Sequence, residues 1–419
     1  MGFGNIAGLR CLQCGTSYRM DQVGYSCPSC DLDGALDVEY DYSELGRSFR
    51  EQVQCHAAFD MWRYHALLPV DAENAPQQHT GGTPLYRLRM PGCGRLLVKD
   101  DSRNPSGSLK DRASALAVAL AAEVGAKTVA AASTGNAAAA LACMAAGTEL
   151  RCVIFAPSNA AQEKLAQIRA YGAEIVDVEG GYDEAFDACD RACHENGWYN
   201  RSTGLNSYMT EGKKTVAFEI FEQMHWAVPD RVFVPVGNGC IVGAVYKGFE
   251  EIKRMGLADR VPRIMGAQAE GSDYMWRAWR DGAGPHTAER RQCHTAASSI
   301  SVALPRDRIK ALRAVEASGG EFLRVSDSHI FAAQLALARA TGVFAEPGAA
   351  AAYAAACQFG AGDRDETTVV LNTGSGLKDI GGLLRSGVLH VAAEVAEVPR
   401  GTLKSVASML RDESRHLAG

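Results

Sequence analysis

Short hydrophobic runs with a high β propensity alternate with alanine-rich stretches along most of the chain. Predicted strands cover residues 96–98, 128–130, 151–155, 174–178, 231–234 and 367–371, and predicted helices cover residues 113–123, 137–146, 161–171, 183–196 and 241–255. Repeated strand, loop and helix order is typical of parallel sheets with crossover helices on both faces. The pattern predicts an α/β fold, in which ligands bind in the loops beyond the carboxyl ends of the strands.

Composition narrows the class of protein further. The chain has 419 residues, of which 47% are hydrophobic and 22% charged, so a disordered or collagen-like chain is excluded. The formal net charge of −6 argues against binding of nucleic acid, which requires a clustered basic surface. No apolar run approaches the roughly 20 residues that span a bilayer. A small polar metabolite is the expected partner, with neither nucleic acid nor membrane.

The first forty residues are rich in cysteine and poor in alanine, which indicates a separate small module. They contain two CxxC motifs, Cys11 with Cys14 and Cys27 with Cys30. No secretory leader opens the chain, so we expect a cytoplasmic protein whose cysteines are thiols or metal ligands. Two such motifs can place four thiolates around a structural zinc ion. The alternative is four unrelated thiols, or a ribbon that has lost its metal.

A loop of small residues, 104–109, leads into an alanine-rich helix with Lys110 at its start. The positive end of the helix dipole and the exposed N–H groups there favour a neutral amine over an ammonium group. A neutral lysine is a nucleophile that can form a Schiff base with an aldehyde cofactor. The alternative is a solvated lysine that begins a helix.

Three further loops follow predicted strands, at residues 132–136, 236–240 and 371–376. The first two open helices, whose N–H groups bind anions such as a carboxylate or a phosphate monoester. The third offers hydroxyl groups, which suit an unprotonated pyridine nitrogen. Each loop alone could be an ordinary glycine turn. Neither a dinucleotide fingerprint nor a Walker loop is present.

Taken in order, the four loops resemble those of the fold type II pyridoxal phosphate enzymes, most closely the threonine synthase family. The resemblance covers roughly residues 83–379 and includes stretches without obvious chemistry, such as 165–177, 211–220 and 346–347. It implies a tryptophan synthase β-like fold with two parallel-sheet α/β domains. The implied division is a zinc-ribbon-like module at 1–45, a large cofactor-binding domain at 46–115 and 215–395, a small domain at 116–214 and a helical tail at 396–419.

The resemblance also implies roles for individual residues. Lys110 would be the Schiff-base lysine and proton shuttle, and Asn136 would hydrogen-bond the ring hydroxyl of pyridoxal 5'-phosphate. Ser133 and Thr134 would hold the substrate carboxylate. Thr373, with Ser375 beside it, would face the pyridine nitrogen. The cofactor phosphate would be held mainly by the backbone of Gly237, Asn238, Gly239, Cys240 and Ile241.

One stretch departs from the family pattern, in which an asparagine, a proline, an aromatic residue and an arginine precede Glu-Gly. Here Asn206 opens the stretch and Met209 stands where the arginine that binds the substrate phosphate is expected. A thioether cannot replace a guanidinium group. Lys213, four residues on, would share a helical face with Met209 and could compensate. The alternative for Lys213 is a solvated side chain.

The resemblance implies a lyase that eliminates phosphate from the γ position of O-phospho-L-homoserine and adds water at Cβ. Met209 leaves open a relative that eliminates or replaces a different, uncharged leaving group in specialised metabolism. A more distant alternative is a non-catalytic binding protein built on the cysteine ribbon. We expect a homodimer, because symmetric two-fold pairs are the commonest oligomers.

Overall fold

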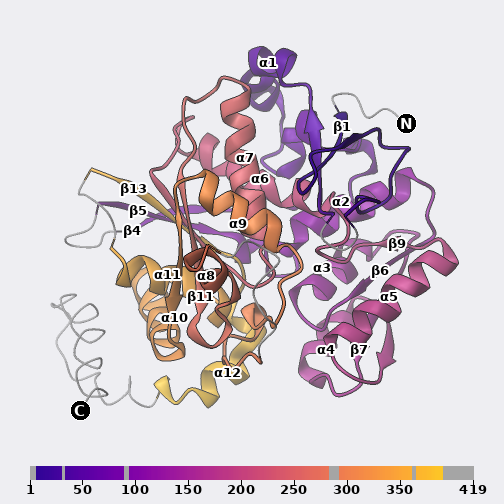
Figure 1. Ribbon diagram of the computed structural model, residues 1–419. Helices are drawn as coiled ribbons and strands as arrows, with labels where there is room; N and C mark the ends of the chain where they lie inside the picture. The colour runs from indigo at the N-terminus through magenta and orange to yellow at the C-terminus, as the bar shows by residue number, and fades with distance from the viewer. Residues whose placement is uncertain (1–5, 31–33, 89–93, 283–291, 361–364, 390–419) are drawn as a thin grey trace, which may run out of the picture.

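The structure is a computed structural model that describes all residues except 1–5, 31–33, 89–93, 283–291, 361–364 and 390–419 (Figure 1). It contains a small three-stranded sheet near the N-terminus, a six-stranded sheet and a four-stranded sheet. No helix in the described part of the chain is long and apolar enough to cross a membrane. The predicted α/β fold with parallel sheets is confirmed.

The six-stranded sheet has the order β12-β11-β10-β13-β5-β4. All neighbouring strands are parallel except β4, which pairs antiparallel with β5. Side chains of β10 alternate between two cores, since Val232 and Val234 pack with α6, α7 and α9, whereas Phe233 packs with α10 and α11. Figure 1 shows these helices on opposite sides of the sheet. The strands are β4 Leu85–Leu88, β5 Arg95–Asp100, β10 Arg231–Pro235, β11 Arg263–Ala269, β12 Glu321–Val325 and β13 Thr367–Asn372.

The four-stranded sheet is parallel, with the order β8-β7-β6-β9. It follows the same alternation: Val129 and Ile154 face a core shared with α2, α3 and α4, whereas Ala130 and Val153 face α5. Both faces are therefore covered, as expected for hydrophobic strands of a parallel sheet. The strands are β6 Thr128–Ala132, β7 Arg151–Pro157, β8 Glu174–Val178 and β9 Tyr199–Asn200.

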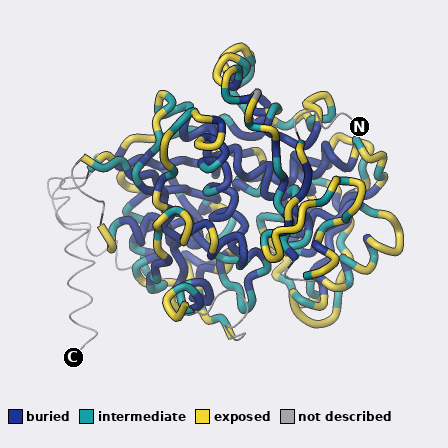
Figure 2. The backbone as a smooth tube through the Cα atoms, turned by 45° about the horizontal axis from the view of Figure 1, so that its top comes forward, coloured by how far each residue is buried: buried dark blue, intermediate teal, exposed yellow. Residues whose placement is uncertain are grey.

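Twelve α-helices and six short 3-10 helices lie in the described residues between and beside the strands. The α-helices are α1 Tyr42–Cys55, α2 Lys110–Glu123, α3 Asn136–Ala145, α4 Gln162–Ala170, α5 Tyr182–Asn196, α6 Met209–Gln223, α7 Cys240–Arg254, α8 Tyr274–Arg280, α9 Arg308–Ala317, α10 Asp327–Thr341, α11 Pro347–Gln358 and α12 Ile380–Arg385. The 3-10 segments are η2 Met61–Leu67, η3 Ala72–Asn74, η4 Asp101–Arg103, η5 Glu270–Ser272, η6 Ser298–Ile300 and η7 Gly376–Asp379. Figure 2 shows that buried chain runs through the centre of both halves.

The N-terminal module is a meander of β1 Ile6–Cys11, β2 Ser17–Tyr18 and β3 Leu36–Tyr40, in the order β2-β1-β3. Its apolar face joins the core formed by α6, α7 and α9. Lys247 of α7 donates to Asp37 (2.8 Å), and Tyr40 donates to Glu211 of α6 (2.7 Å). The module is therefore fixed to α6 and α7 by polar contacts as well as by apolar packing.

Each of the predicted strands and helices is present, with ends shifted by a few residues. The proposed domain limits remain a prediction. The limits at 115 and 214 fall inside α2 and α6, each of which continues without interruption across the limit. The tail predicted at 396–419 lies outside the described residues.

Candidate active site

The four loops singled out in the sequence line one cavity of about 980 Å³ at the carboxyl ends of the strands. The loops after β5 and β10 come from the six-stranded sheet, together with the loop after β13, whereas the loop after β6 comes from the four-stranded sheet. Parallel strands end at the same edge, so their loops meet there. The predicted residues Lys110, Ser133, Thr134, Asn136, Gly237, Asn238, Gly239, Cys240, Ile241, Thr373 and Ser375 all line the cavity.

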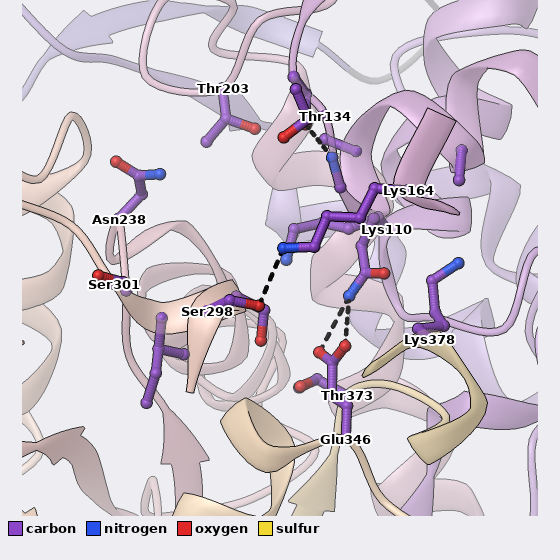
Figure 3. A pocket seen from close by; sticks show the side chains of 18 of the residues that line it. Lys110, Thr134, Lys164, Thr203, Asn238, Ser298, Ser301, Glu346, Thr373 and Lys378 are labelled. Carbon is purple, nitrogen blue, oxygen red and sulfur yellow. Dashed lines mark hydrogen bonds between the residues drawn. The ribbon is translucent and has the colours of Figure 1, made fainter. Parts of the chain in front are cut away.

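Lys110 is the first residue of α2, and its side chain points into the cavity (Figure 3). The backbone of its loop is joined to the loop after β13. Leu109 N–H donates to Thr373 O (2.9 Å), and Ser375 N–H donates to Gly107 O (2.9 Å). These bonds hold the lysine and the hydroxyl-bearing loop in a fixed relation.

The loop after β10 contains a glycine that its backbone conformation and its packing against α9 both require. Gly239, directly before α7, has a φ of 94°, and a Cβ at this position would lie 2.7 Å from the Ala311 side chain. Only glycine adopts such a conformation readily. Asn238 is held by the residues that precede α9. Its side chain accepts from Arg306 N–H (3.2 Å), and its backbone carbonyl accepts from Asp307 N–H (2.9 Å).

Asn136, the first residue of α3, donates through Nδ2 to both carboxylate oxygens of Glu346, at 2.9 and 3.0 Å (Figure 3). Burial raises the pKa of Glu346, although Asn136 and Lys110 act in the opposite direction. Glu346 and Pro347 form one of the stretches of the resemblance that carry no obvious chemistry in the sequence. Proline at the start of α11 marks Glu346 as the residue that precedes the helix, but nothing in the sequence indicates that its side chain turns into a cavity.

Two lysines at the cavity rim were also missed by the sequence analysis. Lys164 of α4 donates to Ser298 of η6 (3.3 Å), a contact between the two walls that Figure 3 shows. Lys378 donates to Ser106 O and to Gln167 Oε1, both at 2.8 Å. Burial lowers the pKa of Lys378. Both lysines line the cavity together with Lys110 and can contribute positive charge to a bound anion.

Asn206, Met209 and Lys213, assigned to substrate binding by resemblance, are not among the lining residues. The Asn206 side chain holds a turn, because Nδ2 donates to Asn200 O and Oδ1 accepts from Tyr208 N–H. Met209 is buried in the apolar core of the small sheet. Lys213 is fully buried, so the alternative of a solvated lysine is wrong.

The four cysteines of the N-terminal module lie together, with all sulfur atoms within 4.8 Å of one another. Cys11 is the last residue of β1, and Cys14 and Cys27 approach to 3.7 Å between sulfurs. This arrangement fits a tetrahedral thiolate site. Four further cysteines, at positions 143, 152, 189 and 193, lie in apolar cores.

The cavity also fits pyridoxal 5'-phosphate by its chemistry. Its walls combine a lysine at a helix start, a glycine-containing loop at the start of a second helix, and hydroxyl groups at a strand end. Arg201, which lines the cavity, is fully buried and has a guanidinium nitrogen without a hydrogen-bond partner among the described residues. A buried cation of this kind requires an anion.

Comparison with known proteins agrees with this geometry. Residues 76–374 match the family model described as pyridoxal-phosphate dependent enzyme. The chain is 40% identical over 380 residues to threonine synthase of Methanosarcina acetivorans, covering 88% of this chain and 92% of the relative. It is 38% identical over 386 residues to threonine synthase of Methanocaldococcus jannaschii, covering 90% and 94%.

Among solved structures, maize serine racemase superposes with a TM-score of 0.60 at 23% identity, covering 74% of this chain and 93% of that one. This likeness supports the fold alone. The family model and the two synthases carry the assignment, because they match most of the chain, and the family model spans Lys110, Asn136, residues 237–241 and Thr373. The chain belongs to the pyridoxal-phosphate dependent enzyme family and is a fold type II member of the threonine synthase type.

Proposed function

We propose that this protein is a pyridoxal phosphate-dependent lyase that converts O-phospho-L-homoserine into threonine and inorganic phosphate. The observation that carries the proposal is the meeting of Lys110, Asn136, the 237–241 loop and Thr373 around one cavity. Similarity to threonine synthases over most of the chain supports the same substrate.

Bound at this site, pyridoxal 5'-phosphate supplies an electron sink for carbanions at the substrate Cα and Cβ. Lys110 Nζ moves protons at these two carbons, since it is the lysine at the cavity wall whose position at the start of α2 is fixed by backbone bonds to the 373–375 loop. Ser133 and Thr134 orient the substrate carboxylate at the start of α3. Thr373 would present a hydroxyl rather than a carboxylate to the pyridine nitrogen, and residues 237–241 would hold the cofactor phosphate.

The proposal is tested by following phosphate release and threonine formation from O-phospho-L-homoserine. The wild-type protein should form both products in equal amounts. Lys110→Ala should lose at least about 1,000-fold in kcat, because proton transfer and covalent capture of the cofactor both disappear. An unchanged rate in Lys110→Ala would contradict the assigned role, and absence of either product from the wild type would contradict the substrate.

A second candidate keeps the same cavity but a different leaving group. The buried Met209 carries no charge, so the family's usual cation is missing from that position. An enzyme of this kind would eliminate or replace an uncharged group at Cβ or Cγ. Turnover of a non-phosphorylated amino acid in preference to O-phospho-L-homoserine would favour it.

We also propose that Cys11, Cys14, Cys27 and Cys30 hold a structural zinc ion. Four protein ligands leave no position open for water, so the ion would stabilise the module rather than react. The purified protein should contain one zinc per chain, and Cys14→Ser should lower that content together with the melting temperature. Retention of full stability without zinc would contradict a structural role.

A homodimer is the oligomeric state that we infer. Leu377, Ile380 and Leu384, on η7 and α12, are large apolar side chains that remain exposed in the monomer. A second copy would remove such a surface from water. Light scattering should give twice the monomer mass, and replacement of Leu384 with Lys should shift the protein toward the monomer.

A further inference from the structure

Arg201 follows β9 directly and forms part of the cavity wall. Two of its nitrogens have partners: Nε donates to Ser114 Oγ and Nη1 donates to Thr203 Oγ1, both at 3.1 Å. Nη2 has no hydrogen-bond partner among the described residues, although the side chain is completely buried. These two bonds fix the guanidinium group, and the third nitrogen is left for a ligand.

Lys213, on the first turns of α6, does not itself line the cavity, but it lies near enough to Arg201 and Cys240 for their charges to act on it. It too is completely buried, and its Nζ lacks a hydrogen-bond partner among the described residues. Burial lowers its pKa to about 8; Arg201 and Lys110 act in the same direction, whereas Cys240 and Asp307 act in the opposite one. Two cations therefore share one buried region next to Cys240, the first residue of α7.

Leaving two unpaired cations together in a protein interior is unfavourable, because each has lost its hydration without gaining a partner. Asp307 is the carboxylate that acts on Lys213, but it forms no ion pair with it. A phosphate dianion offers the missing acceptors, and the guanidinium group binds phosphate with favourable geometry.

Both the cofactor and the proposed substrate carry a phosphate monoester. The loop after β10 is assigned to the phosphate of the cofactor. Arg201 belongs to a different segment of the cavity lining, because it follows β9 of the four-stranded sheet. We propose that Arg201 and Lys213 form the binding site for the side-chain phosphate of the substrate, an inference that rests on the proposed function. The cation absent at position 209 is thus supplied from position 201.

The experiment uses the enzyme saturated with pyridoxal 5'-phosphate and inorganic phosphate as the probe. With the cofactor bound, its own phosphate site is filled, so any further phosphate binding reports a second anion site. In the wild type, phosphate should raise the melting temperature and inhibit competitively against O-phospho-L-homoserine. Arg201→Gln should weaken phosphate binding and raise KM by roughly 10- to 100-fold, the effect of losing a charged hydrogen bond.

Three further variants guard against misfolding and general charge effects. Arg201→Lys should recover part of the phosphate affinity, since it restores the charge without the planar geometry. Lys213→Met should weaken phosphate binding independently of Arg201. Arg151→Gln removes the same charge from an exposed position on β7 and should leave phosphate binding unchanged. In each variant, cofactor affinity, measured from its absorption spectrum, should stay within about threefold of wild type, less than the loss of one hydrogen bond.

Equal phosphate binding by wild type and Arg201→Gln would overturn the proposal. Loss of cofactor affinity in Arg201→Gln, with phosphate binding to the loaded enzyme unchanged, would also overturn it and assign the cations to the cofactor. Phosphate binding that depends on Arg201, without turnover of O-phospho-L-homoserine, would support the site and contradict only the proposed substrate. The two hypotheses therefore fail separately.

Discussion

Two groups of completely buried cations in this protein differ in how their charge is balanced. Around Arg112 and Lys99, each cation has a carboxylate partner: Arg112 pairs with Asp101 and Glu219, both at 2.6 Å, and Lys99 pairs with Glu219 at 2.6 Å. Thr83 adds a further acceptor for Lys99 through its carbonyl (2.6 Å). Around Arg201 and Lys213, one nitrogen of each cation is unpartnered in the described structure.

Position explains the difference. The Arg112 group joins α2 and α6 to β5 and to the residue that follows it. Neither Arg112 nor Lys99 lines the cavity. In the second group, Arg201 lines the cavity and Lys213 lies outside the lining, close enough to Arg201 for the two charges to interact. A charge that serves the fold needs a permanent partner, whereas a charge that serves a ligand must keep its hydrogen-bonding capacity until the ligand binds.

The largest expected effect comes from breaking the paired group. Arg112→Met should lower the free energy of unfolding by about 3–5 kcal/mol, because Asp101 and Glu219 are left buried with too few partners. Urea unfolding of the cofactor-loaded enzyme measures this. Phosphate binding by the fraction that remains folded should be unchanged. A loss below about 1 kcal/mol would show that the paired group contributes no more than an exposed ion pair.

The unpaired group should respond in the opposite direction. Lys213→Met should stabilise the phosphate-free enzyme near neutral pH by about 3 kcal/mol, which corresponds to the lowering of the lysine pKa from 10.5 to about 8. Between these two values the unfolded chain binds more protons, so the stability of the wild type rises with pH. The difference in free energy of unfolding between Lys213→Met and wild type should therefore disappear by about pH 10.

Urea unfolding of both proteins at these two pH values, with and without phosphate, tests this. Saturating phosphate should remove the advantage of Lys213→Met at neutral pH, because the bound anion gives the ammonium group its partner. A variant that is less stable than wild type under all conditions would indicate that Lys213 is paired in solution and would place it in the same class as Arg112.

A smaller effect is expected from Glu219→Gln, about 2 kcal/mol, since an amide still accepts hydrogen bonds but no longer balances two cations. Burial raises the pKa of Glu219, but Arg112 and Lys99 lower it by more, so the net shift is downward. The stability that the Glu219 carboxylate contributes is therefore present above the usual pKa of a glutamate. It is lost as the pH falls through the lowered pKa of Glu219. The variant should lose less stability in acid than wild type, which a series of melting temperatures at decreasing pH would show.

Much of the fold could be predicted from the sequence because the signals are local. In β6 and β10, hydrophobic runs are followed at once by glycine-containing loops and helices, and the structure has each element with small shifts. The four cavity loops were identified for the same reason, since Lys110 and Asn136 stand at helix starts that the sequence marks clearly.

The remaining site residues could not be found in this way because their roles depend on contacts between distant segments. Arg201 follows a two-residue strand, and its partner Ser114 is 87 residues away. Glu346 meets Asn136 across 210 residues. Lys213 was a candidate from the sequence, but its complete burial depends on tertiary packing, which only the structure reveals.

The smallest expected effect comes from an ion pair that belongs to neither group. Arg151 and Glu174 join β7 to β8 at 2.5 Å, and their side chains are 50% and 55% exposed. Water screens both charges whether or not they are paired, so Arg151→Gln should change the free energy of unfolding by only a few tenths of a kcal/mol. Urea unfolding at low and high salt measures this, and the small difference should vanish at high salt. A loss comparable to that of Arg112→Met would mean that burial does not decide the strength of these charges, and the contrast between the two buried groups would then need another cause.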